Sequence, residues 1–135
     1  ALDEGIVPGG GIALMHSRNV EVDTENKDQE LGAQIVIEAC KAPFNSIMEN
    51  AGLNSEVIWN QVAASGLNGT GGYDARSEQI VDMFKEGIID TAKVTRTAIE
   101  KAGSVAGTII TTECLITREV TDEAGDTNVN MPMGM

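Results

Sequence analysis

Three segments of this 135-residue chain carry residues whose types could hold a small ligand. The run Gly9-Gly10-Gly11 precedes an apolar helical pattern, so a ligand could approach its backbone without meeting a side chain. Further along, Asp74-Ala75-Arg76 forms a polar segment, and Gly87-Ile88-Ile89-Asp90 ends in a carboxylate directly before the longest helical pattern. Because the chain is strongly acidic, any small anionic ligand must be held by backbone amides, by a helix N-terminus or by a metal ion.

Each of these segments also has an ordinary structural explanation. The glycine run could form a tight turn between helices. Asp74 is a common turn former, and Asp90 stands where an N-cap would accept a hydrogen bond from the first helical turn. The residue types alone leave both the binding and the structural explanation open.

The sequence lacks the side-chain groupings of a metal site or of a redox pair. His16 is the sole histidine and has no partners at zinc-ligand spacing, so we interpret it as structural or exposed. Cys40 and Cys114 lie far apart in apolar segments and belong to no Cys-x-x-Cys motif. We therefore expect reduced core thiols and no metal site.

Composition limits the partners of the chain. Lys and Arg number 9 against 21 Asp and Glu, which gives a formal net charge of -12. A charge of this sign repels phosphate backbones and anionic membranes, so we expect no nucleic-acid partner and no membrane partner. No run of about 18 apolar residues predicts a membrane span, and the acidic start lacks the basic region of a signal peptide. Aromatic residues make up only 3% of the chain, so the core must consist mainly of aliphatic side chains and Met.

Apolar spacing predicts a mainly helical chain. Leu31, Ile35 and Ala39 recur at four-residue steps, and Val94 and Ala98 begin a longer stripe that predicts one buried helix face. Residues 1–4 are typical of a last helical turn, with a glycine after it. The expected helices cover residues 12–17, 28–43, 44–51, 55–64, 77–86 and 91–110, and the expected extended pieces cover 72–74, 88–89 and 112–120.

The same segments, in this order and at these separations, resemble the C-terminal part of the ATP-binding equatorial domain of group I chaperonins, bacterial GroEL and its mitochondrial counterpart. The resemblance starts at Val7-Pro8-Gly9-Gly10-Gly11-Ile12-Ala13-Leu14 and continues through Asp28-Gln29, Ala42-Pro43, Lys93-Val94-Thr95-Arg96 and Ile110-Thr111-Thr112-Glu113-Cys114. It implies a mainly α fold, the multihelical half of an equatorial domain with a few short β-strands, over residues 1–120. Residues 121–135 would form a flexible tail, first acidic and then Met/Gly-rich, and we expect this tail to be disordered.

The resemblance also implies a nucleotide site. In the family, the middle glycine of the first motif contacts the ribose through its backbone, and that position is Gly10 here, with Gly9 beside it. Asp74-Ala75 matches the adenine pocket, whereas Arg76 departs from the family, which has a small residue at that position. Ile88 and Asp90 match the motif whose aspartate meets the ribose hydroxyls. These residues form the predicted cofactor-binding set.

The ligand implied for the complete protein is ATP or ADP with Mg²⁺. The family's phosphate loop and the aspartate that positions water fall outside this sequence, so we expect no catalytic residue here. The chain alone should neither hydrolyse ATP nor fold client proteins, and it need not bind nucleotide by itself. Its partners would be the rest of the subunit and neighbouring ring subunits; unfolded clients and a co-chaperonin would be reached only through the complete protein. Bacterial cytoplasm is the expected location, with the mitochondrial matrix as the alternative. A free-standing small nucleotide-binding or oligomerising module is the alternative function.

Overall fold

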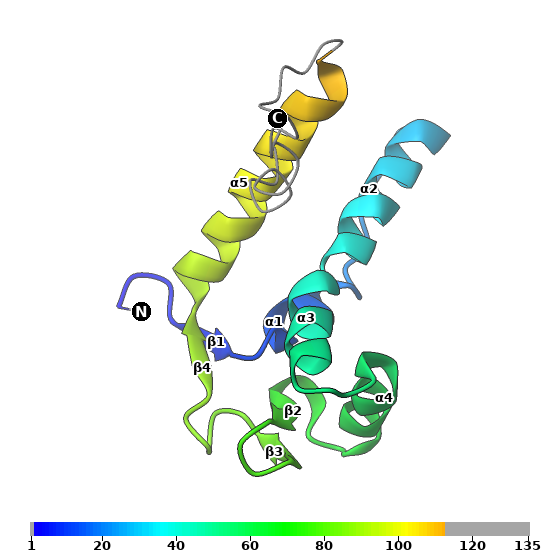
Figure 1. Cartoon of the computed structure of the whole chain (residues 1–135). Helices are drawn as coiled ribbons and strands as arrows, with labels where there is room; N and C mark the ends of the chain where they lie inside the picture. Colours follow the sequence, from blue (N-terminus) through cyan, green and yellow to red (C-terminus); the bar gives the residue numbers. More distant parts are fainter. Residues whose placement is uncertain (1, 113–135) are drawn as a thin grey trace, which may run out of the picture.

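The structure, a computed structural model, describes residues 2–112, which form mainly α-helices with a few short strands (Figure 1). This confirms the mainly α fold class. The predicted strand over 112–120, the tail over 121–135 and Cys114 lie outside the described residues. In chain order the elements are β1 (Ile6–Pro8), α1 (Ile12–Ser17), α2 (Lys27–Ala39), α3 (Ala42–Asn50), α4 (Ser55–Ala64), the 3-10 helix η1 (Asn68–Thr70), β2 (Gly71–Asp74), β3 (Gln79–Asp82), β4 (Ile89–Thr91) and α5 (Ala92–Thr111).

The helix boundaries follow local signals in the sequence. α1 covers the predicted residues 12–17, and the side chain of Asn54 caps α4 by accepting hydrogen bonds from the amides of Glu56 and Val57. Gly5 has a φ of 85°, the left-handed conformation expected of a glycine placed after a turn. None of the described helices is long and apolar enough to cross a membrane.

The short strands pair as two separate antiparallel ribbons. β1 pairs with β4, which brings Val7 opposite Asp90, although the two strands lie near opposite ends of the described chain. β2 and β3 form a hairpin in which Tyr73 lies opposite Ile80. The prediction of a helical segment over 77–86 was therefore wrong, because four of its residues pair with β2 instead. Glu78, with a φ of 57°, lies in the turn of this hairpin.

One compact core joins α1, α3, α4 and the hairpin. Ile12, Phe44 and Met83 are fully buried, and Met48 is 1% exposed. The aromatic rings continue this packing, since Phe44 meets Trp59 edge-on at a centroid distance of 5.8 Å. The core cluster consists of Ile12, Met15, Phe44, Met48, Ile58, Val62 and Met83. Its members confirm that aliphatic and Met side chains carry most of the packing.

The two longest helices lie largely outside this core. In Figure 1, α2 and α5 extend in the same general direction away from the part of the molecule that holds the short strands. Neither helix has a buried residue within its bounds, and Ile35 of α2 and Val94 of α5 are 62% and 64% exposed. The predicted buried face of the long helix is thus apolar but uncovered. Cys40, at the C-terminus of α2, is buried with a free thiol, as predicted.

Candidate functional site

The glycine run forms a tight turn between β1 and α1. Gly10 and Gly11 adopt φ values of 67° and 76°, a conformation that disfavours residues with a Cβ atom. Gly11 is also approached closely: a Cβ built on it would lie 2.7 Å from the backbone nitrogen of Phe44. The amide of Gly9 donates to the carbonyl of Ile88 at 2.9 Å. Gly9 and Gly11 therefore have structural functions, and the half-buried Gly10 is the glycine of the run that is left to contact a ligand.

Asp90 lies in β4 and its side chain is solvent-exposed. The N-cap position of α5 is Thr91, whose side chain makes no capping hydrogen bond, so the N-cap explanation of Asp90, one of the two left open by the sequence, was wrong. The physical reason is its pairing with Val7, which keeps Asp90 in extended backbone and delays the helix by one residue. As a result, the Asp90 carboxylate is not committed to an amide of the first helical turn.

A groove brings Gly10 and Asp90 to one surface. It has a volume of about 380 Å³ and lies between the glycine turn, α3 and the first turns of α5. Apolar atoms form most of its wall, and Asp90 is the charged residue among those that line it. The lining consists of Pro8, Gly10, Gly11, Ala13, Leu14, Pro43, Ile47, Asp90, Val94, Thr95 and Ala98. Such a groove can receive an apolar or flat group while one carboxylate accepts hydrogen bonds from hydroxyl groups.

The second predicted segment lies in the hairpin turn and does not line this groove. The Asp74 carboxylate accepts hydrogen bonds from the Ser77 hydroxyl at 2.8 Å and from the Arg76 amide at 2.9 Å. The Ser77 bond, followed by the Arg76 amide, lowers the pKa of Asp74 below its usual value. Ala75 and Arg76 are exposed. Asp74 thus stabilises the hairpin turn, the structural function that its residue type favours.

Met83 connects the two parts of the predicted site. A Cβ on Gly10 would lie 3.2 Å from the Cε atom of Met83, and a Cβ on Gly72 would lie 2.6 Å from its Cγ and Sδ atoms. The glycine turn and the hairpin therefore pack on opposite portions of one buried side chain. Sequence reasoning missed this function of Met83, because spacing within the 77–86 segment says nothing about contacts with the distant glycine run.

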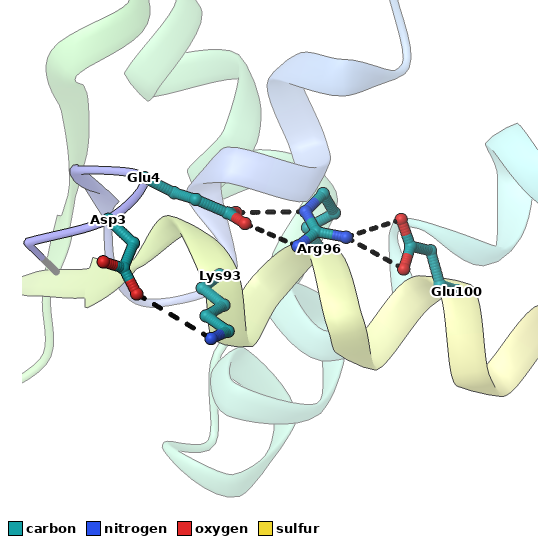
Figure 2. A network of polar contacts seen from close by, with 5 residues as sticks. All are labelled: Asp3, Glu4, Lys93, Arg96 and Glu100. Carbon is teal, nitrogen blue, oxygen red and sulfur yellow. Dashed lines mark hydrogen bonds and ion pairs between the residues drawn. The ribbon is translucent and has the colours of Figure 1, made fainter.

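A network of ion pairs links Asp3 and Glu4, in the turn near the N-terminus, to α5, as Figure 2 shows. Arg96 donates to Glu4 through Nε at 3.0 Å and through Nη2 at 2.5 Å, and its Nη1 donates to Glu100. The hydrogen bond from Arg96 lowers the pKa of the Glu4 carboxyl. Lys93 and Asp3 form a longer pair beside it, at 3.9 Å. These contacts place the start of the chain next to the helix that forms one wall of the groove.

A larger, open hollow lies elsewhere and contains none of the predicted site residues. It has a volume of about 660 Å³ and is bounded by residues 21–24 and by α2. Glu21, Asp23 and Glu30 line it, so it repels anions. Within residues 2–112, no cluster of three or more His, Cys, Asp or Glu is arranged to hold a metal ion. His16 instead packs edge-on against Trp59 at a centroid distance of 5.3 Å, which is the structural one of the two roles, structural or exposed, that we expected for it.

Comparison with known proteins places this geometry in a family. Residues 1–119 match the model of the TCP-1/cpn60 chaperonin family. The fold is similar to the crystal structure of a group III chaperonin in the open state, with a TM-score of 0.66 and 26% sequence identity over 83% of this chain. The chain spans 24% of the length of that chaperonin chain. The family match covers all of the residues that the structure describes, and the chain therefore belongs to the TCP-1/cpn60 chaperonin family.

Proposed function

We propose that this chain is the C-terminal part of the equatorial domain of a group I chaperonin and contributes the ribose and adenine side of its nucleotide site. The observation that carries the proposal is the meeting of Gly10 and Asp90 on one groove. These two residues come from motifs near opposite ends of the described chain, and the pairing of β1 with β4 holds them together. The order of the motifs, from the glycine run to the tail, supports the group I assignment.

The residues of the groove fit the sugar of a nucleotide. Gly10 can contact the sugar only through its backbone, since it has no side chain and a Cβ atom there would meet Met83. The exposed Asp90 carboxylate does not cap α5, and it can accept hydrogen bonds from two ribose hydroxyls. Ile88 orders the turn by accepting the Gly9 amide at 2.9 Å. Asp74-Ala75-Arg76 would face the base from the hairpin, and the Met83 contact ties this hairpin to the glycine turn.

The same lining explains why we expect no hydrolysis by the chain alone. Among the residues that line the groove there is no Lys, Arg or His to offset phosphate charge, and Asp90 would repel it. ATP or ADP with Mg²⁺ is therefore a ligand of the complete subunit, whose remaining part would supply the phosphate contacts. Clients and a co-chaperonin would likewise be reached only through the complete protein, in the bacterial cytoplasm.

The uncovered helix faces suggest where the remaining part of the subunit, and neighbouring subunits, would pack. Leu31, Ile35 and Val36 of α2 are each at least half exposed, and Val105 and Ile109 of α5 are 59% and 51% exposed. Apolar surface on this scale is typical of an interface rather than of a free face. Self-association of the isolated chain, driven by these faces, is the expectation that follows.

The proposal is tested by following backbone amide resonances of the isotope-labelled chain during titration with ADP. Because the phosphate contacts belong to the rest of the subunit, we expect only weak binding, with shifts at Gly10, Gly11 and Asp90 at high ADP concentration. The shifts should be much smaller when the analogue lacks both ribose hydroxyls, because those hydroxyls bind the carboxylate. Asp90→Asn should weaken the ADP response, whereas Glu21→Gln, in the acidic hollow, should leave it unchanged. Shifts confined to the hollow, or equal responses to both nucleotides, would contradict the assignment of Asp90. Measurable Mg²⁺-dependent ATPase activity that Asp90→Asn abolishes would favour the free-standing alternative.

A further inference from the structure

The turn between α4 and β2 presents an Asn-Gly pair to solvent. Asn68 and Gly69 are both exposed and lie in the 3-10 helix η1. Asn68 has a φ of 52°, one of only two positive values among the described non-glycine residues. Asn tolerates this left-handed conformation better than most residues do. The backbone at Asn68 is thus held in a turn whose outer side is open.

Gly69 has free space around it. No heavy atom lies within 4 Å of the position where a Cβ would stand, and its φ is not in the left-handed region. Its flanks, by contrast, are fixed: the Thr70 hydroxyl donates to the Leu67 carbonyl at 2.9 Å and contacts Asp82 Oδ2 at 3.2 Å. Gly71 is buried against Leu67. The pair therefore forms a solvent-exposed tip between two anchored positions.

We propose that Asn68 is a site of spontaneous deamidation, a modification that would alter the start of β2. The backbone nitrogen of Gly69, after losing its proton, attacks the side-chain carbon Cγ of Asn68. The bond from Cγ to Nδ2 breaks and ammonia leaves, which closes a five-membered succinimide. Water then opens the ring at either carbonyl, giving Asp or isoaspartate. No oxidant, reductant or enzyme is required, and the absence of a side chain on Gly69 removes the steric obstacle to the attack.

The modification would have two effects on the fold. It adds a negative charge to a chain whose formal charge is already -12, two residues before Thr70, which contacts the Asp82 carboxylate. IsoAsp also adds one atom to the backbone path between Leu67 and Thr70. Because both flanks are anchored, this extra length cannot be absorbed locally and must displace the start of β2.

Three other asparagines of the described chain, Asn26, Asn45 and Asn54, are placed in ways that oppose the same reaction. The Asn54 Oδ1 atom accepts two amide hydrogen bonds as the cap of α4, and Asn26 caps α2 in the same manner. Asn45 lies within α3 and is followed by Ser46, whose Cβ atom hinders the attack that Gly69 leaves open. Asn54 is also followed by a serine, so it serves as the internal reference site.

The test is to incubate the folded full chain at mildly alkaline pH and to map peptides by mass spectrometry, with an isoaspartate-specific methylation assay. The converted fraction at Asn68 should exceed that at Asn54 several-fold, and the rate at Asn68 in the folded chain should approach its rate in concentrated urea. Gly69→Ala should suppress conversion and leave the circular dichroism spectrum and unfolding midpoint unchanged, since the added methyl meets open space. Strong protection of Asn68 by folding, or conversion undiminished in Gly69→Ala, would overturn the proposal.

Discussion

Replacing Gly11 by Ala should be among the most destabilising single-methyl changes in this chain, because two independent penalties fall on one residue. Its φ of 76° costs an L-residue roughly 1–2 kcal/mol. The new Cβ would also lie 2.7 Å from the backbone nitrogen of Phe44 and 2.9 Å from its Cα atom. Backbone cannot rotate out of the way as a side chain can, so α3 itself must shift. Overpacking of this kind adds about 1–3 kcal/mol.

Two other glycines separate these penalties. Gly52 has a φ of 75°, and no heavy atom lies within 4 Å of the position of its Cβ atom. Gly52→Ala should therefore show the conformational cost alone, roughly 1–2 kcal/mol. Gly10 has a φ of 67°, and a Cβ atom there would meet only the Cε atom of Met83, at 3.2 Å, which is the flexible end of a side chain. Its cost should be close to that of Gly52→Ala. The expected order of destabilisation is Gly11 first, then Gly10 and Gly52.

The assay is urea unfolding followed by circular dichroism and by the fluorescence of Trp59, the only tryptophan. The free energy of unfolding should fall further for Gly11→Ala than for Gly52→Ala, with similar urea dependence in the three variants. Equal losses for these two would refute the close approach of the glycine turn to α3. A loss at Gly10 equal to that at Gly11 would mean that Met83 cannot move aside.

Three further predictions concern single side chains. Burial lowers the pKa of His16 below its ordinary value. The contribution of His16 to the free energy of unfolding should therefore be complete above the pKa of the unfolded state, near 6.5, and should decline as the pH falls below that value. The free energy of unfolding measured against pH should show this decline, and His16→Phe should remove it. Arg96→Gln should cause a small loss in the free energy of unfolding that shrinks with added salt, because the ion pair of Arg96 with Glu4 is exposed and therefore screened. A loss that does not change with salt would contradict this. Asn54→Ala should cost about 1 kcal/mol, seen as a lower urea midpoint, by removing the cap of α4, and no change would mean that the cap is unimportant.

Features that depend on neighbouring residues in the sequence were predictable. α1 begins after the glycine run and ends at Ser17 as expected, because an apolar pattern and a preceding turn define it locally. Asn54 directly precedes the expected helix over 55–64, a position that favours Asn as a cap, and its side chain does accept hydrogen bonds from the first amides of α4. A helix end or cap needs only a few adjacent residues, so the sequence contains the information.

Features that depend on distant partners were not predictable in the same way. The 77–86 segment has an apolar pattern compatible with a helix, but Ile80 and Val81 pair with β2 and so form a strand. The position of Asp90 before the long helix suggested a cap as its structural explanation, whereas pairing with Val7 places it in β4. Periodicity identified the apolar face of α5 correctly, but it cannot tell whether another segment covers that face. The Gly10 and Asp90 groove was expected only through resemblance, because no local pattern relates the two motifs.

The pairing of β1 with β4 has a consequence for the order of folding. Contacts within α3 and α4 join residues close in sequence and can form early, whereas β1 must wait for β4, which follows all of these helices in the chain. Closing so long a loop has an entropic cost, which slows the formation of contacts of high sequence separation. During synthesis, the helices of the core could pack before Ile89 leaves the ribosome, but the groove could not. Its two sides would be among the last parts of the molecule to meet.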